Sequence, residues 1–155
     1  KSKMNKPEYL YIKNNQLGVH EDTEKIVKVI AGKFEKAEGP EKGHNVDPIY
    51  FHVILEEGKE FTCDVPSGHN SFVYLLAGDL SIGENKHDKT SNSNLILLDR
   101  GDKLIVKANK KSEFLFIAGK PIGEPIARGG PFVMNTKAEI LQAVQDYHNG
   151  TFAKY

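Results

Sequence analysis

The sequence predicts an all-β domain, a sandwich or jelly-roll barrel, with one short helix near its C-terminal end. Between residues 7 and 119, short runs of β-branched and aromatic residues alternate with clusters of Gly, Asn, Asp and Pro at regular intervals. Helical spacing of apolar residues is found in one late segment, after residue 136. Many short strands joined by tight turns, followed by a single helix, are typical of two-layer β architectures.

A chain of 155 residues is long enough for one domain with a sizeable core. We assign residues 1–119 to the barrel with an N-terminal lead-in strand. Residues 120–155 form a Gly/Pro-rich loop, a helix and a tail of the same domain. Gly58, Gly78 and the polar tract 83–92 are among the expected turns. The expected strands lie near Tyr9–Ile12, Lys25–Ala31, Ile49–Leu55, Glu60–Val65, Ser71–Ala77, Asp79–Ile82, Leu95–Leu98, Lys103–Val106 and Glu113–Ala118.

The segment from Ala118 to Gly150 carries the strongest local signals. It has too many Gly and Pro residues for a sheet or helix interior, and then it enters a capped helix. Thr136 and Glu139 form a capping box, in which the hydroxyl accepts from a free N–H and the carboxylate reaches back. Gly150 stands where a left-handed helix stop is expected.

This C-terminal segment carries more apolar side chains than a small barrel can easily bury. A large exposed apolar patch usually marks an interface, so we expect one here. The expected partner is another domain of the same protein or a second copy of the chain. The candidate interface residues are Phe132, Met134, Ile140, Val144, Tyr147 and Phe152.

Composition narrows the classes of partner. Lys and Arg number 21, and so do Asp and Glu, which gives a formal net charge of zero. Such a balance argues against direct nucleic-acid binding, which needs a basic surface. No apolar run approaches the roughly 20 residues of a membrane span. The single cysteine, Cys63, excludes an internal disulfide and fits a reducing compartment, so we expect a cytoplasmic protein, or a nuclear one if the source is eukaryotic.

Two sequence stretches carry a family resemblance. The order GKPIGEPI, GPFVMNT and EI-x-QA-xx-DY after residue 118 resembles the C-terminal signature of the pirin family. The segments GKEFTCDVPSGHNSFVYLLAGDLSIG and LLDRGDKLIVKANKKSEFLFIAG resemble the two motifs of the cupin superfamily. The resemblance implies a cupin barrel, and it covers only the C-terminal half of the two-cupin pirin architecture. The opening stretch KSKMNKPEYLYI is similar to the connection that leads out of the first pirin domain, and the alternative is an unrelated β-sandwich with similar turns.

The resemblance also implies where metal chemistry belongs. In pirins the iron is held by the N-terminal cupin, which this chain lacks. The family's first-motif ligand positions align here with Asp64, Pro66 and Asn70, and the second-motif His aligns near Ser112–Phe114. None of these positions offers an imidazole, and Pro66 has no donor atom in its side chain. We therefore expect no transition metal and no other cofactor in this chain.

A few polar residues remain as candidates for binding a small ligand. If the strand parity follows that of the metal-binding relatives, Asp64, Asn70 and Tyr74 line the barrel with Phe72. His52 is a candidate for a core or cavity-wall position, although both faces of its strand look apolar. Among the residues set aside as structural, His69 is expected to close the turn at Gly68, and Cys63 is expected to be a buried, inert thiol.

Two functions follow from these observations. The first is a metal-free C-terminal cupin with a structural and interface role, in a pirin-like protein that is either a quercetin 2,3-dioxygenase-like enzyme or a transcription cofactor. The second is a metal-free cupin that binds a small ligand in its barrel. No residue set in the chain suggests a catalytic centre, so we expect the chain to be inactive by itself.

Overall fold

The computed structural model describes residue 6 and residues 8–41, 45–83, 88–91 and 93–152. Contacts divide the chain into two compact units. The larger is Tyr11–Pro121, and the smaller combines Lys1–Leu10 with Ile122–Tyr155. In the described ranges, no helix is both long and apolar enough to cross a membrane.

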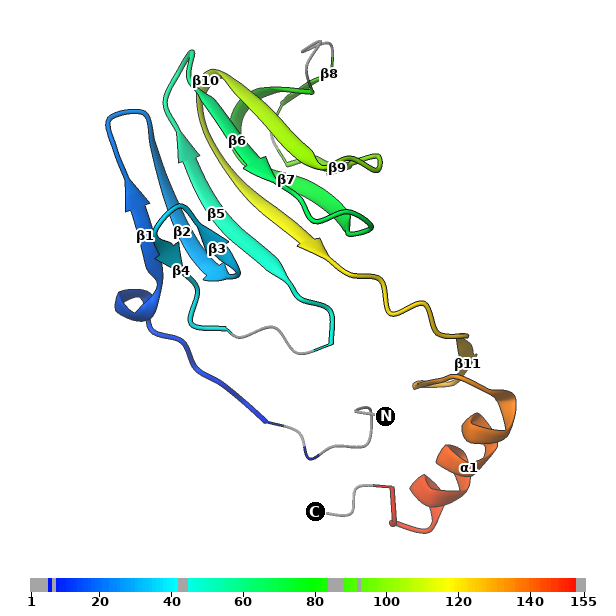
Figure 1. Cartoon of the computed structure of the whole chain (residues 1–155). Coiled ribbons are helices and arrows are strands. Elements are labelled where there is room, and N and C mark those ends of the chain that lie inside the picture. The colour runs from blue at the N-terminus through cyan, green and yellow to red at the C-terminus, as the bar shows by residue number, and fades with distance from the viewer. Residues whose placement is uncertain (1–5, 7, 42–44, 84–87, 92, 153–155) are drawn as a thin grey trace. The chain divides into compact units, whose positions relative to one another are not determined.

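The larger unit is built almost entirely from strands (Figure 1). Strands β7 and β10 are the longest, with 13 and 17 residues. A short 3-10 helix, Asn14–Gln16, precedes the first strand. The strands are β1 (Gly18–Glu21), β2 (Lys25–Ala31), β3 (Lys33–Phe34), β4 (Ala37–Glu38), β5 (Ile49–Leu55), β6 (Glu60–Asp64), β7 (Asn70–Ile82), β8 (Asp88–Ser91), β9 (Leu95–Leu97) and β10 (Lys103–Gly119).

One eight-stranded antiparallel sheet folds over into two layers, because β7 and β10 each contribute to both (Figure 1). The second half of β10 pairs with β5 and with the first half of β7, which gives a larger layer in the order β1-β2-β5-β10-β7-β9. The first half of β10 pairs with β6 and with the end of β7, and β8 completes the smaller layer. Register shifts between Ala108 and Phe114 mark where β10 passes from one layer to the other.

Because side chains alternate along a strand, every second side chain points into the barrel. In β5 the pattern is buried at Phe51, Val53 and Leu55, and β10 is buried at Phe114 and Phe116 in register with them. These residues form a single core cluster that joins both layers. Its largest fully buried side chains are Phe51, Phe61, Phe114, Phe116, Leu55, Leu75 and Leu80.

The smaller unit contains a hairpin and a helix. Strands β11 (Ala127–Gly129) and β12 (Phe132–Met134) pair with each other, and helix α1 (Lys137–His148) follows. Thr136 is the N-cap and shares a reciprocal capping box with Glu139, as predicted. Gly150 has a φ of +67°, the left-handed conformation expected after a helix end.

The expected all-β fold with one C-terminal helix is confirmed, and several strand boundaries differ. Tyr9–Ile12, predicted as a strand, is not one in the structure. The tract predicted as a polar loop contains β8, and the Gly/Pro-rich loop contains the hairpin β11–β12. The sequence predicts two pairs of short strands, Ser71–Ala77 with Asp79–Ile82 and Lys103–Val106 with Glu113–Ala118. In the structure each pair is one long bent strand, β7 and β10 respectively.

The bend of β7 against β10 depends on Gly78. Its φ is +101°, and a Cβ at this position would lie 2.6 Å from the carbonyl oxygen of Lys111 and from the Cα of Ser112. The Ser112 hydroxyl accepts from the N–H of Asp79 at 3.0 Å and donates to the carbonyl of Lys110 at 2.7 Å. The crossing point therefore combines a close backbone approach with a buried hydroxyl that satisfies nearby peptide groups.

We expect Gly78→Ala to lower the free energy of unfolding by about 2–4 kcal/mol, because the new methyl group meets backbone atoms that cannot move aside. Urea unfolding monitored by far-UV circular dichroism measures this. Gly58→Ala is the matched control, since Gly58 also has a positive φ, +76°, but has no neighbour within 4 Å of the added Cβ. The control should cost about 1 kcal/mol. Equal losses in the two variants would contradict the proposed role of close packing at Gly78.

Candidate functional site

The interior of the barrel is filled by aromatic side chains. Phe61 lies 5.7 Å from Phe114, centroid to centroid, in an edge-to-face contact, and Phe51 lies 6.1 Å from Phe116. Phe34 stacks on Phe61 at 5.3 Å. Close-packed interiors of this kind leave little free volume. The part of the interior around these aromatic side chains is therefore a hydrophobic core.

The residues that face this core differ from those expected. Cys63, Val65 and His69 are buried, whereas Asp64 and Asn70 are exposed. The cause is the phase of β6, which begins with an exposed Glu60 and a buried Phe61, so that odd-numbered residues point inward. The expected parity, with Asp64 and Asn70 lining the barrel, is wrong.

His69 is the most deeply buried histidine that the structure describes, with 7% of its surface exposed. Its N–H donates to the carbonyl of Pro66 at 3.1 Å and so closes the turn between β6 and β7, as predicted. Its ring Nδ1 is buried and has no hydrogen-bond partner in the described part of the chain. His69 is thus a buried residue of the turn that leads into β7.

The residues aligned with the histidine of the second cupin motif, Ser112–Phe114, do not supply metal ligands to the interior either. Ser112 and Phe114 are buried, and Ser112 is already engaged at the crossing of β7 and β10. Glu113 points to the other face of β10, where its Oε1 lies 2.6 Å from Nε2 of His52. Across the described ranges, no three His, Cys, Asp or Glu side chains are grouped as a metal site requires. The interior does not fit the iron site of a catalytic cupin, in which several imidazoles and a carboxylate converge.

Cys63 has the environment of an inert thiol. It is buried and it is the only cysteine in the sequence. Loss of hydration, together with the neighbouring charge of Asp64, raises the pKa of the thiol to about 11. A protonated thiol is a poor nucleophile and a poor metal ligand, so Cys63 belongs to the core.

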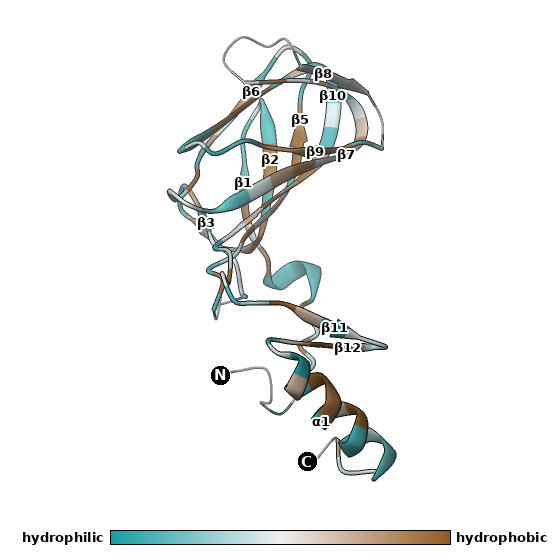
Figure 2. Cartoon of the chain, turned by 90° about the vertical axis from the view of Figure 1, so that its right-hand side faces the viewer, coloured by the Kyte–Doolittle hydropathy of each residue, from teal (hydrophilic) through white to brown (hydrophobic). Residues whose placement is uncertain are grey.

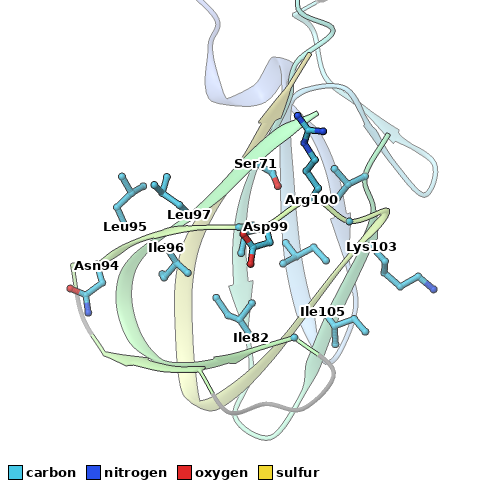
Figure 3. A pocket seen from close by; sticks show the side chains of 15 residues that line it. Ser71, Ile82, Asn94, Leu95, Ile96, Leu97, Asp99, Arg100, Lys103 and Ile105 are labelled. Carbon is cyan, nitrogen blue, oxygen red and sulfur yellow. The ribbon is translucent and has the colours of Figure 1, made fainter. Parts of the chain in front are cut away.

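A cavity of about 730 Å³ opens between the two layers beside β9 (Figure 3). Ile96 and Ile82 point into it, whereas Leu95 and Leu97 point away. Asp99 and the hydroxyl of Ser71 also face the space, and Arg100 stands at its rim. We call this the seam cavity. Its size falls within the range of small-molecule sites, and it combines apolar walls with a few polar groups.

The predicted ligand residues do not meet in the seam cavity. Tyr74 and His52 are half-buried and lie on the outer face of the larger layer, where both are in register with Leu115. Asp64 and Asn70 are exposed, on the outer sides of β6 and β7. Whether any of them binds a ligand stays a prediction. The sequence alone does not predict the seam cavity, because its walls come from five separate segments of the chain. Only Asn94–Gly101 is a long continuous stretch of the lining.

The smaller unit has an apolar hollow of about 680 Å³ between its hairpin and its helix. Phe132 lies 5.0 Å from Phe152 and 6.0 Å from Tyr147, centroid to centroid. Figure 2 shows hydrophobic residues along β12 and α1. Ile140 packs against Gly129, where a Cβ would lie 2.5 Å from its methyl group. The hollow is lined by Pro131, Phe132, Val133, Met134, Val144, Tyr147, His148 and Phe152, which include all the candidate interface residues except Ile140.

A bent antiparallel sheet in two layers, closed around one core, defines this protein as a cupin. Residues 50–153 match the sequence model of the Pirin C-terminal cupin domain. The chain belongs to the pirin family, as a C-terminal cupin domain, and the predicted family is confirmed.

The relatives are longer proteins. The chain is 35% identical over 152 residues to a pirin-like protein of Caulobacter vibrioides, covering 97% of this chain and 54% of that protein. It is 34% identical over 151 residues to human pirin, covering 95% of this chain and 51% of pirin. A crystal structure of a quercetin 2,3-dioxygenase from Acinetobacter baumannii superposes with a TM-score of 0.80 at 30% identity, covering 95% of this chain and 51% of that one. The chain thus spans about half the length of these relatives.

We expect Cys63 to react with a maleimide or an aromatic disulfide at least about a hundredfold more slowly in the native protein than in urea, because burial keeps the thiol protonated. Absorbance at pH 8 after mixing with an aromatic disulfide reagent measures this. Thr62→Cys, at an exposed position of the same strand, is the control and should react fast in the native state. Rapid labelling of the unmodified chain at pH 8 would show that Cys63 is accessible.

Proposed function

We propose that this chain is the metal-free half of a two-cupin protein of the pirin family, with a structural and interface role. The observation that carries the proposal is the interior packed with Phe51, Phe61, Phe114 and Phe116, each fully buried. A catalytic cupin needs this space for a metal and for a substrate. The family membership of the chain and its match to about half of each relative support the same assignment.

The activity of the whole protein is the next part of the proposal. The Acinetobacter relative is named a quercetin 2,3-dioxygenase, so a related oxygenase activity is the first candidate, and a transcription-cofactor role is the second. Oxygen chemistry of this type depends on a redox metal with open coordination positions. We assign that metal, an iron ion by family resemblance, to the other cupin. The residues of this chain then act by holding the shape and position of that half.

The C-terminal hollow is the first candidate for the surface that meets the other half. Its walls are aromatic and aliphatic, and Tyr147 on its rim is largely exposed. Aromatic residues in a concave apolar site are typical of the centre of a protein interface. The hollow would accept an apolar side chain or a short segment of the partner.

A second function rests on the seam cavity. Ile96 and Ile82 supply apolar walls, and Asp99 and Ser71 supply hydrogen-bonding groups. This arrangement suits a small aromatic molecule that carries a hydroxyl group. The sequence predicts a small-ligand site inside the barrel, at Asp64, Asn70 and Tyr74. We assign this alternative function to the seam cavity instead, because Asp64 and Asn70 are exposed.

We expect the chain, purified without a His-tag, to carry less than about 0.1 equivalent of iron, zinc or copper, because its interior offers no converging donor set. It should also fail to consume quercetin after metal addition, under conditions in which the Acinetobacter enzyme turns over. Inductively coupled plasma mass spectrometry and absorbance of the flavonol measure the two outcomes. One bound equivalent that is lost in Cys63→Ser or Asp64→Ala would contradict the metal-free assignment.

We expect the isolated chain to self-associate or to retain a partner through the C-terminal hollow, and Val144→Asp to reduce this association, because a charge at the hollow opposes its burial. Light scattering over a concentration series gives the measurement. Gln145→Asp changes the neighbouring exposed position and should have no effect. A strictly monomeric, highly soluble chain without a bound partner would contradict the interface at the hollow.

For the seam cavity, phenol is the probe, because it joins an aromatic ring to one hydroxyl group. We expect saturable chemical-shift changes in NMR spectra at residues around β9, and Ile96→Asp should abolish them by placing a charge inside the cavity. Leu97→Asp is the matched control, since the adjacent Leu97 points away from the cavity. Unchanged spectra at millimolar phenol would rule out this second function.

A further inference from the structure

The loop of residues 99–101 joins the two layers beside the seam cavity. It begins after Leu98, whose N–H donates to the carbonyl of Ser71 on β7 at 3.1 Å. It ends before Asp102, whose carbonyl accepts from the N–H of Val65, next to β6, at 2.8 Å. Backbone hydrogen bonds thus hold the loop at both ends, one in each layer. A short loop that a rigid scaffold positions in this way is well suited to a binding role.

Two charged side chains of this loop meet the cavity at different places. Asp99 faces the space, and Arg100 stands at its rim (Figure 3). Within the part of the chain that the structure describes, neither side chain makes a hydrogen bond or an ion pair. Both residues are exposed, so a ligand can reach them. The loop therefore presents a carboxylate and a guanidinium, and each can bind a group of a ligand.

The other walls of the cavity are mainly apolar. Val65, Ile82 and Leu104 are buried residues of its lining. Ile96 points into the space from β9, and the hydroxyl of the half-buried Ser71 faces it from β7. An ionised group placed against apolar walls loses hydration and needs a partner of opposite charge. The apolar part of a ligand therefore belongs inside the cavity, and an anionic part belongs at the rim.

Asp99 restricts the polar group that can lie inside. An ionised carboxylate only accepts hydrogen bonds, so it requires a donor and repels an anion. A phenolic hydroxyl is a neutral donor at pH 7, because its ordinary pKa is about 10. The hydroxyl of Ser71 can donate to the oxygen of the same phenol. An aromatic ring with a hydroxyl group therefore fits the inner part of the cavity.

Arg100 selects the opposite kind of group at the rim. A guanidinium presents its N–H donors in one plane and can bind a carboxylate through two parallel hydrogen bonds. Lys103, at the start of β10, extends away from the space and is in register with Asp64 on β6. Arg100 is thus the better placed of these two cations for an anionic group of a ligand.

We propose that the seam cavity is selective for phenolic acids, whose hydroxyl group donates to Asp99 and whose carboxylate pairs with Arg100 at the rim. This inference rests on the second proposed function, in which the cavity binds a small aromatic molecule with a hydroxyl group. It adds a negative charge at the other end of that ligand. The cavity, with about 730 Å³, has room for more than one ring, so a phenolic acid with one ring is the smallest suitable probe.

Three probes that share a phenol ring test the selectivity. At pH 7, 4-hydroxyphenylacetate is anionic, 4-ethylphenol is neutral and tyramine is cationic. Titrations of the full chain, followed by NMR chemical shifts, give the dissociation constants. We expect 4-hydroxyphenylacetate to bind at least about threefold more tightly than 4-ethylphenol, and tyramine to bind most weakly. The preference for the anion should shrink at high salt, because Arg100 is exposed.

Variants assign the two ends of the ligand to the two side chains. Arg100→Gln should abolish the preference for 4-hydroxyphenylacetate over 4-ethylphenol. Lys103→Gln removes the same charge from a nearby position and is the matched control, which should keep the preference. The probe 4-methoxyphenylacetate lacks the O–H donor and should bind at least about threefold more weakly than 4-hydroxyphenylacetate. Asp99→Leu should remove this difference between the methoxy and the hydroxy acid.

Equal affinities for the three phenols would overturn the inference and would leave the second proposed function intact. Tightest binding of tyramine would make the cavity a site for cations and would equally overturn it. Equal losses of the preference in Arg100→Gln and Lys103→Gln would show that net charge, not a contact with Arg100, sets the selectivity. Absence of binding by every probe would overturn both this inference and the second proposed function.

Discussion

The structure depends on one interaction above all, the continuous pairing of β10 with its neighbours. Within a single strand of 17 residues, β10 bonds to β6, β7 and β5, so that it holds both layers together. The irregular region between Ala108 and Phe114 lets the strand bend, and Gly78 and Ser112 fix the bend against β7. The pairing at this crossing decides which side chains of the neighbouring strands face the core, because a shift of one residue would exchange the inner and outer faces of a strand.

The direction in which each strand's side chains point explains what the sequence could and could not predict. Length, turn residues and strand composition were sufficient for the all-β fold, and the capping box of Thr136 and Glu139 was sufficient for the helix. The inward or outward direction of Asp64 and Asn70 was not predictable, because it depends on where β6 begins relative to its partner Lys103–Lys107 on β10. His52 was ambiguous for a physical reason: its strand is apolar on both faces, so alternation carries no information there.

The candidate sites were predictable to different degrees for the same reason. The C-terminal hollow is built from residues close in sequence, and its aromatic members were recognisable as a group. The seam cavity and the outer face of the larger layer are built from strands that meet only in the folded sheet. Leu95 and Leu97 look like ordinary strand residues until the pairing of β9 with β7 shows that both stand on an outer face. Long-range register, not residue type, is the missing information.

This cupin has a packed apolar interior and, on the outer side of its larger layer, several apolar side chains that are not buried. In a barrel that binds a ligand, some polar residues face the interior, and polar residues normally cover the outer side that faces solvent. Here four phenylalanines fill the interior, while tyrosine, leucine and isoleucine side chains remain on the outer face of the larger layer. A packed interior makes the barrel rigid, and an apolar outer face makes a solvated state costly. Both properties fit the proposed structural role, in which this domain would hold another domain in place.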